Sequence, residues 1–242
     1  MFKFLKNIMN NEEVNLTNDA YSLHRILKTD IKKDPSVEED EIIFGCGCFW
    51  GAEKCFWKLP GVVTTSVGYA GGEKNNPTYY EVCSGLTGHS EVVRVIWDKR
   101  EIDVSDLLKM FWECHDPTQK NRQGNDMGTQ YRSAIYYKNE NNIKTILASK
   151  EQYQTELSKK NLGLIETEIK MIDSYFYAEQ YHQQYLASAG SRQYCSASPT
   201  KVKLGVFTGS NYKLEDHIWE NFNWEVDKCV LRSDNNPIKN NI

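Results

Sequence analysis

The sequence predicts one α/β domain in which helices pack on a mixed sheet in two layers. Segments rich in apolar and β-branched residues alternate along the chain with segments of helical periodicity, as in a sheet covered by helices. The chain has 242 residues and 40% hydrophobic content, which is enough for one core. Two long polar loops, 70–88 and 116–132, interrupt the alternation, and loops of this length in a compact domain are usually functional.

The first half of the predicted domain holds three strands and two helices. The strands are short apolar and β-branched runs, the last dense enough in apolar residues for both faces to be partly buried. Helix 49–59 ends at Pro60–Gly61, and helix 103–115 is amphipathic, with Asp103 or Ser105 available as its N-cap. In order, we expect strand 41–44, helix 49–59, strand 62–69, strand 89–97 and helix 103–115.

The second half continues the alternation. Residues 133–137 form a strand candidate, and a long polar helix is expected around residues 140–159. Residues 164–172 alternate in the manner of a strand, and residues 178–188 are typical of a short helix.

The two ends differ in composition from residues 41–200, which we expect to form the main folded domain. Residues 1–40 are polar and without a sustained hydrophobic period, so we predict a flexible leader. Residues 201–242 carry aromatic side chains that can dock on the domain, followed by an Asn-rich end that we expect to be disordered.

Composition excludes several functions. The net charge is -4 and the basic residues are scattered, which disfavours nucleic-acid binding. No apolar run approaches the ~20 residues that span a bilayer, and the N-terminus lacks the apolar core of a secretory signal. Seven irregularly spaced cysteines fit a reducing compartment. We therefore expect a cytoplasmic location, with a mitochondrial location as the alternative. We also expect a monomer.

Cys48 lies where a predicted strand ends and a predicted helix begins. The free N–H groups and positive dipole of a helix N-terminus stabilise a thiolate, so we expect a lowered pKa for Cys48. Gly47 and Gly51 permit close backbone approach, and Phe49 and Trp50 form an apolar wall beside the sulfur. These residues alone leave a reactive thiol and an inert buried cysteine about equally favoured.

Two other functions remain open at this point. A cysteine hydrolase would pair Cys48 with a histidine, for which His182 is a candidate, although a structural role for His182 is favoured. A non-catalytic thiol or metal-binding module would use Cys46 with Cys48, but the chain has no CxxC pair to complete a tetrahedral zinc site. We expect no bound metal.

Five motifs together resemble the peptide methionine sulfoxide reductase A family, over roughly residues 41–199. In order they are GCFWGAE, VGYAGG, NPTYYEVCSGLTGHSEVV, FWECHDPTQKNRQGNDMGTQYRSAIYY and YHQQYL. The resemblance implies an α+β fold with a ferredoxin-like mixed sheet. It also implies reduction of the S epimer of methionine sulfoxide, free or in oxidised proteins, as a repair reaction under oxidative stress.

The resemblance assigns Cys48 as the attacking thiolate and Phe49 and Trp50 as the slot for the substrate methyl group. It assigns Glu91 as the acid that protonates the sulfoxide oxygen. Glu91 stands in an apolar strand, where desolvation should raise its pKa and keep it protonated.

The resemblance also implies that Tyr79 and Tyr131 donate hydrogen bonds to the sulfoxide oxygen. Tyr80 is a neighbouring candidate, and Tyr79 is preferred because it directly follows Pro-Thr, as in the family motif. Asp126 matches a carboxylate that orients the loop and water near the site.

After attack, a sulfenic acid on Cys48 would condense with a second thiol to give a disulfide. Cys55 lies roughly 10.5 Å along the same helix, beyond the ~7 Å limit between Cα atoms, and Cys46 is interpreted as a bystander. By the resemblance, Cys195 is the favoured resolving cysteine, and Cys229 is a possible second relay. Thioredoxin is the implied electron donor, with no bound cofactor.

Overall fold

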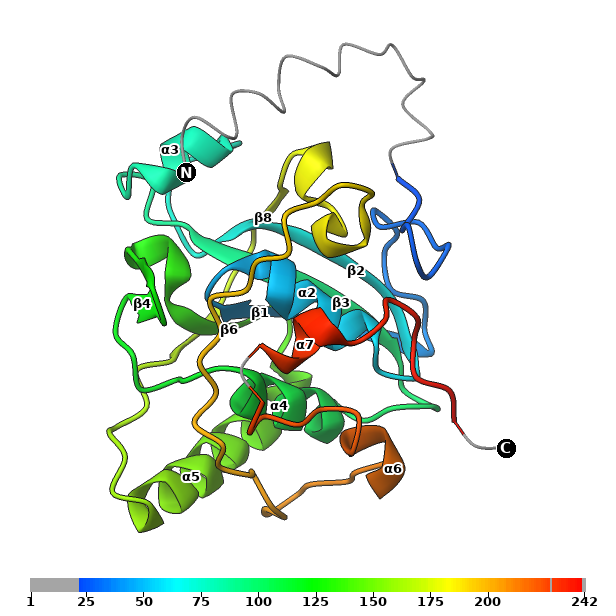
Figure 1. Cartoon of the computed structure of the whole chain (residues 1–242), viewed down its shortest axis with the longest axis vertical. Helices are drawn as coiled ribbons and strands as arrows, with labels where there is room; N and C mark the ends of the chain where they lie inside the picture. The colour runs from blue at the N-terminus through cyan, green and yellow to red at the C-terminus, as the bar shows by residue number, and fades with distance from the viewer. Residues whose placement is uncertain (1–21, 227, 241–242) are drawn as a thin grey trace.

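The computed structural model describes residues 22–226 and 228–240 (Figure 1). A six-stranded sheet has the order β7-β6-β1-β3-β2-β8. The strands are β1 (Glu39–Cys46), β2 (Val62–Ala70), β3 (Ser90–Asp98), β6 (Ser133–Tyr137), β7 (Glu168–Met171) and β8 (Tyr175–Tyr177). The middle four, β6-β1-β3-β2, are antiparallel, and β7 adds to β6 in parallel. This is the predicted mixed sheet, and its central order is that of a split β-α-β-β-α-β unit.

Helices α2 (Phe49–Trp57) and α4 (Val104–Cys114) provide the second layer. Phe44 of β1 stacks on Phe56 of α2 at 4.9 Å and on Phe111 of α4 at 5.1 Å between ring centroids. Such stacked contacts at the centre of a core fix how the two helices lie on the sheet. The predicted two-layer α/β fold is therefore confirmed.

Helix α4 begins where the sequence predicted. Asp103 caps it by accepting the Ser105 N–H at 2.9 Å. In turn, the Asp106 carboxylate accepts the Asp103 N–H. Helix α5 (Ile143–Lys159) lies outside α4, next to it in space. No helix in the described part of the chain is both long and apolar enough to cross a membrane.

Both long loops contain structure that the sequence analysis missed. Loop 70–88 holds the short helix α3 (Tyr79–Cys83), which begins with a capping box between Thr78 and Glu81. Loop 116–132 holds a two-stranded hairpin, β4 (Arg122–Gln123) with β5 (Asp126–Met127), and a 3₁₀ turn, Thr129–Tyr131.

The helix predicted over 178–188 does not form. Two 3₁₀ turns, Gln180–His182 and Tyr185–Ala187, replace it. Gln184 between them has a φ of 46°, a left-handed conformation that a helix cannot include. The carboxyl group of Glu53 on α2 accepts hydrogen bonds from both the main chain and the side chain of Gln184, at 2.8 and 2.7 Å, and holds it there.

The expectation of a flexible leader is wrong for residues 22–40, whereas residues 1–21 lie outside the described part. His24 and Ile31 are buried in this segment. His24 Nε2 lies 2.9 Å from Thr65 Oγ1, whose hydroxyl donates to Glu53 at 3.0 Å. Burial raises the pKa of Glu53 to about 7 and lowers that of His24 to about 3. A buried polar network thus ties this segment to α2.

The C-terminal residues 201–226 and 228–240 also pack on the domain, and the last of them run along α2. The short helix α6 (Asp216–Trp219) is followed by α7 (Cys229–Arg232), which lies beside α2 (Figure 1). Beyond α7, Lys54 Nζ donates to the Ser233 carbonyl at 2.7 Å, and Trp57 Nε1 donates to the Asn235 carbonyl at 3.0 Å. The expected disorder of the Asn-rich end is therefore wrong for residues up to 240.

Candidate active site

Cys48 stands between β1 and α2, as predicted. Gly47 makes the turn with a φ of 85°, and a Cβ there would lie 2.5 Å from Gln123 Cβ, so only glycine fits. Cys48 is the N-cap residue of α2, and Phe49 is the first helical residue. The turn places the Cys48 sulfur at the edge of a cavity rather than in the sheet.

The protonation of Cys48 differs from the prediction. Its side chain is only 8% exposed. Burial raises the pKa of the Cys48 thiol well above its ordinary value, the Glu91 carboxylate raises it further, and the N–H of Trp50 opposes both. Desolvation outweighs the helix N-terminus here, and Cys48 rests as a neutral thiol.

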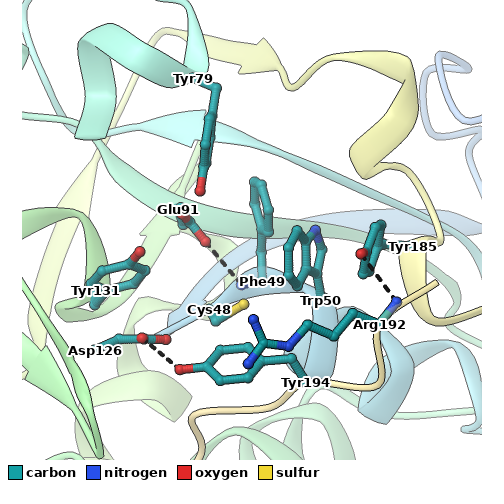
Figure 2. A pocket seen from close by; sticks show the side chains of 10 residues that line it. All are labelled: Cys48, Phe49, Trp50, Tyr79, Glu91, Asp126, Tyr131, Tyr185, Arg192 and Tyr194. Carbon is teal, nitrogen blue, oxygen red and sulfur yellow. Dashed lines mark hydrogen bonds between the residues drawn. The ribbon is translucent and has the colours of Figure 1, made fainter. Parts of the chain in front are cut away.

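A cavity of about 260 Å³ opens beside this thiol (Figure 2). It is lined by Cys48, Phe49, Trp50, Tyr79, Glu91, Asp126, Tyr131, Tyr185, Arg192 and Tyr194. All seven side chains predicted for catalysis or substrate binding therefore face one space, although they come from five separate parts of the chain.

Glu91 lies on β3 and is 2% exposed. Its Oε2 accepts the N–H of Phe49 at 3.2 Å, which leaves Oε1 to carry a proton toward the cavity. Burial raises the pKa of Glu91 to about 8, and the charge of Asp126 adds to this, while the Phe49 N–H opposes both. At neutral pH Glu91 is therefore mostly a neutral acid, as the sequence analysis expected.

Tyr79 and Tyr131 approach the cavity from α3 and from the 3₁₀ turn before β6, with their hydroxyls directed toward Glu91 (Figure 2). Burial raises the pKa of both phenols, so both remain O–H donors. Tyr80 is 39% exposed and does not line the cavity, which agrees with the preference for Tyr79.

The apolar wall is held by His182. Trp50 Nε1 donates to His182 Nδ1 at 3.1 Å, and the Phe49 ring lies 5.0 Å from the imidazole. Burial lowers the pKa of His182 to about 3, so it is neutral, with its hydrogen on Nε2. No histidine in the described part of the chain hydrogen-bonds Cys48. The geometry therefore does not support a cysteine hydrolase.

Three residues that the sequence analysis missed complete the cavity. Tyr185 stacks on Trp50 at 3.9 Å between centroids. Tyr194 donates to Asp126 Oδ1 at 2.6 Å, and the Arg192 guanidinium lies 5.3 Å from the Tyr194 ring. The only indication of these residues in the sequence is that Tyr194 directly precedes Cys195. If Cys195 reaches the site, its neighbours along the chain must lie near the site as well.

Cys195 lies against the first turn of α2. A Cβ at Gly51 would be 2.5 Å from Cys195 Sγ, so this glycine makes room for the sulfur. The next residue, Ser196, accepts the Cys48 N–H at 3.4 Å. Cys229, in the first turn of α7, shares a second, smaller cavity with Cys195. Burial raises the pKa of both thiols to about 12.

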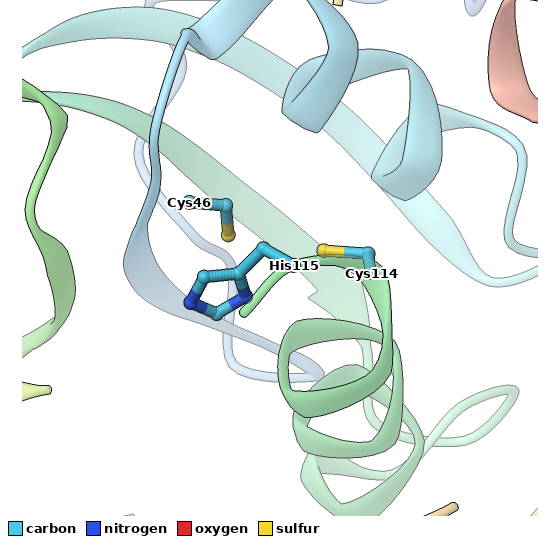
Figure 3. A group of neighbouring side chains, drawn as sticks. All are labelled: Cys46, Cys114 and His115. Carbon is cyan, nitrogen blue, oxygen red and sulfur yellow. The ribbon is translucent and has the colours of Figure 1, made fainter. Parts of the chain in front are cut away.

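Cys46 is not paired with Cys48. Its sulfur, that of Cys114 and a ring nitrogen of His115 lie within 4.8 Å of one another (Figure 3). His115 Nδ1 lies 2.7 Å from the Phe111 carbonyl, which can only accept, and Nε2 lies 2.7 Å from a serine hydroxyl. Both ring nitrogens are thus engaged, and a metal would have to displace one of these bonds. The geometry does not support a preformed metal site.

Comparisons with known proteins agree with this arrangement. Residues 40–212 match the family model described as peptide methionine sulfoxide reductase. The chain is 53% identical over 180 residues to a peptide methionine sulfoxide reductase MsrA of Vibrio vulnificus, covering 74% of this chain and 86% of the relative. The corresponding protein of Azotobacter vinelandii is 57% identical over 164 residues, covering 68% and 76%.

Solved structures show the same likeness. Methionine sulfoxide reductase A of Corynebacterium diphtheriae superposes with a TM-score of 0.64 at 42% identity, covering 76% of this chain and 88% of the other. The reduced form of Mxr1 from Saccharomyces cerevisiae has a TM-score of 0.62 at 36% identity, covering 69% and 93%.

Proposed function

This chain belongs to the peptide methionine sulfoxide reductase A family, and from that premise we propose that it reduces the S epimer of methionine sulfoxide with Cys48 as the attacking sulfur. The enzyme class, a peptide methionine sulfoxide reductase, follows from the family and its relatives. The epimer and the residue roles are the proposal. The observation that carries them is the convergence of Cys48, Glu91, Tyr79 and Tyr131 on one cavity.

Substrate recognition divides between the two sides of the cavity. The methyl group packs on Phe49 and Trp50, and the sulfoxide oxygen faces the hydroxyls of Tyr79 and Tyr131 and the acid of Glu91. A bound substrate displaces water from between these walls, which strengthens each polar contact to the oxygen. The opposite epimer would exchange the methyl group and the oxygen and would leave the buried donors unpaired.

Glu91 supplies the proton that makes the oxygen a leaving group. It donates to the sulfoxide oxygen as Cys48 attacks, and the proton of the Cys48 thiol replaces the one that Glu91 gives up. In total, the oxygen passes to Cys48, which becomes a sulfenic acid, and the substrate sulfur gains two electrons. The electrons come from Cys48, so this step uses no bound cofactor.

Cys195 then condenses with the sulfenic acid, losing water and forming a disulfide with Cys48. Two contacts support this role of Cys195: its packing on Gly51, and the contact of Ser196 with the Cys48 backbone. Cys229 then receives the disulfide from Cys195 as a second relay, and the cavity that the two cysteines share supports this step. Thioredoxin is the proposed external reductant, and free methionine sulfoxide or oxidised proteins are the proposed substrates.

The epimer is tested with dithiothreitol as reductant and each resolved epimer of a methyl sulfoxide as substrate. We expect only the S epimer to be consumed, as measured by chiral chromatography. Equal consumption of both epimers, or consumption of the R epimer alone, would overturn the stereochemical assignment while leaving the reductase activity itself intact.

The resolving thiol is tested by one turnover without reductant, followed by peptide mapping under acid quench. We expect a peptide that links Cys48 with Cys195, and with Cys195→Ser we expect a sulfenic acid on Cys48 that a dimedone probe captures. If wild-type Cys48 is linked to Cys229 alone, Cys195 is not the resolving cysteine.

A further inference from the structure

Four cysteines have no part in the cycle described above: Cys83, which is only partly buried, and three that lie in the core. Cys46 ends β1, Cys55 lies on α2 and Cys114 ends α4, and all three are buried. We call them the inner thiols. A single buried cysteine is ordinarily a small hydrophobic residue, so only their arrangement can indicate more.

The inner thiols are continuous with the resolving cysteine. A cavity of about 20 Å³ is lined by Cys55, Cys114, Cys195 and Cys229 together. Cys55 is one helical turn after Gly51, against which the Cys195 sulfur packs, so both sulfurs lie along the same face of α2. Cys46 does not line this cavity, but its sulfur lies within 4.8 Å of the Cys114 sulfur (Figure 3).

Building on the proposed function, we propose that the inner thiols form an internal electron reserve, which takes the disulfide from Cys195 and stores it at Cys114. The reserve would return Cys48 and Cys195 to their thiol forms, so the chain completes one more turnover before it needs an external reductant. The small shared cavity gives the sulfurs room to change partners.

Each step is a thiol–disulfide exchange. Cys55 attacks Cys195 in the Cys48–Cys195 disulfide, so a Cys55–Cys195 bond forms and Cys48 leaves as a thiolate. Cys114 then attacks Cys55, which forms a Cys55–Cys114 bond and frees Cys195. The proton of each attacking thiol passes to the leaving thiolate. In total two inner thiols lose two electrons, which methionine sulfoxide has received. A further exchange can move the bond to Cys46–Cys114.

Cys195 is needed as the carrier because Cys55 cannot reach Cys48 along the helix, given a separation of roughly 10.5 Å at 1.5 Å per residue. The exchange is expected to be slower than the first turnover. The hydrogen bond with Cys114, and then burial, raise the pKa of Cys55 well above the ordinary value. The hydrogen bond with Cys46, and then burial, raise the pKa of Cys114 likewise, against a lowering by the hydrogen bond with Cys55. Only the thiolate attacks a disulfide.

The reserve is tested by counting methionine released per chain from excess racemic methionine sulfoxide without any reductant. We expect wild type to release one methionine more than Cys114→Ser, in a slower second phase. Cys83→Ser removes a thiol outside the shared cavity and is expected to leave the count at the wild-type value. Cys55→Ala, which blocks entry to the reserve, should match Cys114→Ser.

Mapping wild type after the slow phase provides a second readout that needs no variant. We expect Cys114 in a disulfide with Cys55 or Cys46. Equal counts for wild type and Cys114→Ser, or full alkylation of all three inner thiols after the reaction, would overturn the proposal. Release of a first methionine by every variant shows that the reductase reaction itself holds, whereas its absence from wild type would point to failure of the proposed function.

Discussion

Cys48→Ser is expected to lower methionine sulfoxide reduction by at least about 1,000-fold. A serine hydroxyl at this position cannot take the substrate oxygen to form a stable oxidised intermediate, and its oxygen is a far weaker nucleophile than sulfur. The measurement is methionine formation in excess dithiothreitol, where the resolving cysteines are not needed to complete the cycle.

The loss of activity in Cys48→Ser must be distinguished from unfolding of the variant. Cys48 lies at the edge of the cavity, and serine is close to it in volume, so the melting temperature of the variant should stay near that of wild type. Retention of more than a tenth of the wild-type rate by a folded Cys48→Ser variant would show that another group attacks the sulfoxide.

Glu91→Gln is expected to lower kcat by about 100- to 10,000-fold, the usual contribution of a general acid. Glutamine keeps the shape and can still accept the Phe49 N–H, but it has no acidic proton to give to the leaving oxygen. The isosteric change makes this variant a direct test of proton transfer rather than of packing. A kcat within a factor of ten of wild type would assign the proton to another donor, such as Tyr79 or Tyr131.

The pH dependence of kcat/KM, compared between wild type and Glu91→Gln, gives an independent test of the role of Glu91. The pKa of Glu91 is raised to about 8, so the carboxyl carries its proton below that pH and loses it above. The slope of log kcat/KM against pH should therefore decrease by one near pH 8 in wild type. The bend is expected to be absent from Glu91→Gln, whatever the contribution of Cys48 ionisation at higher pH.

The fold was largely predictable because hydrophobic periodicity is a local property. The central strands and helices α2 and α4 followed from runs of apolar residues and from their caps or stop signals, and α5 was expected as a long polar helix. The failures lie where tertiary contacts override local preference. Residues 178–188 have a helical pattern, yet the buried carboxyl of Glu53 holds Gln184 in a left-handed conformation. Residues 22–40 look polar, yet they dock through His24.

The candidate site was predictable only in part. Cys48, Phe49 and Trp50 are consecutive, and their position at a strand–helix turn could be read directly. Glu91, Tyr79, Tyr131 and Asp126 needed the ordered motifs, because nothing in their local pattern places them together. Tyr185 reaches the cavity from a short 3₁₀ turn, and Arg192 and Tyr194 reach it from irregular chain, where no periodicity indicates which side chains point inward.

The sequence by itself determined that a helix begins just after Cys48, since Gly47, the preceding apolar strand and the following helical run act over a few residues. Only the tertiary structure decided the protonation of that cysteine and the partners of the others. Desolvation depends on atoms brought from β3, from the Asp126 hairpin and from the segment around Cys195, and here it outweighs the dipole of one helix end. The same convergence places Cys46 beside Cys114 rather than beside Cys48, because Gly47, with a φ of 85°, turns the chain between the two cysteines, whereas the end of β1 and the end of α4 meet in the core.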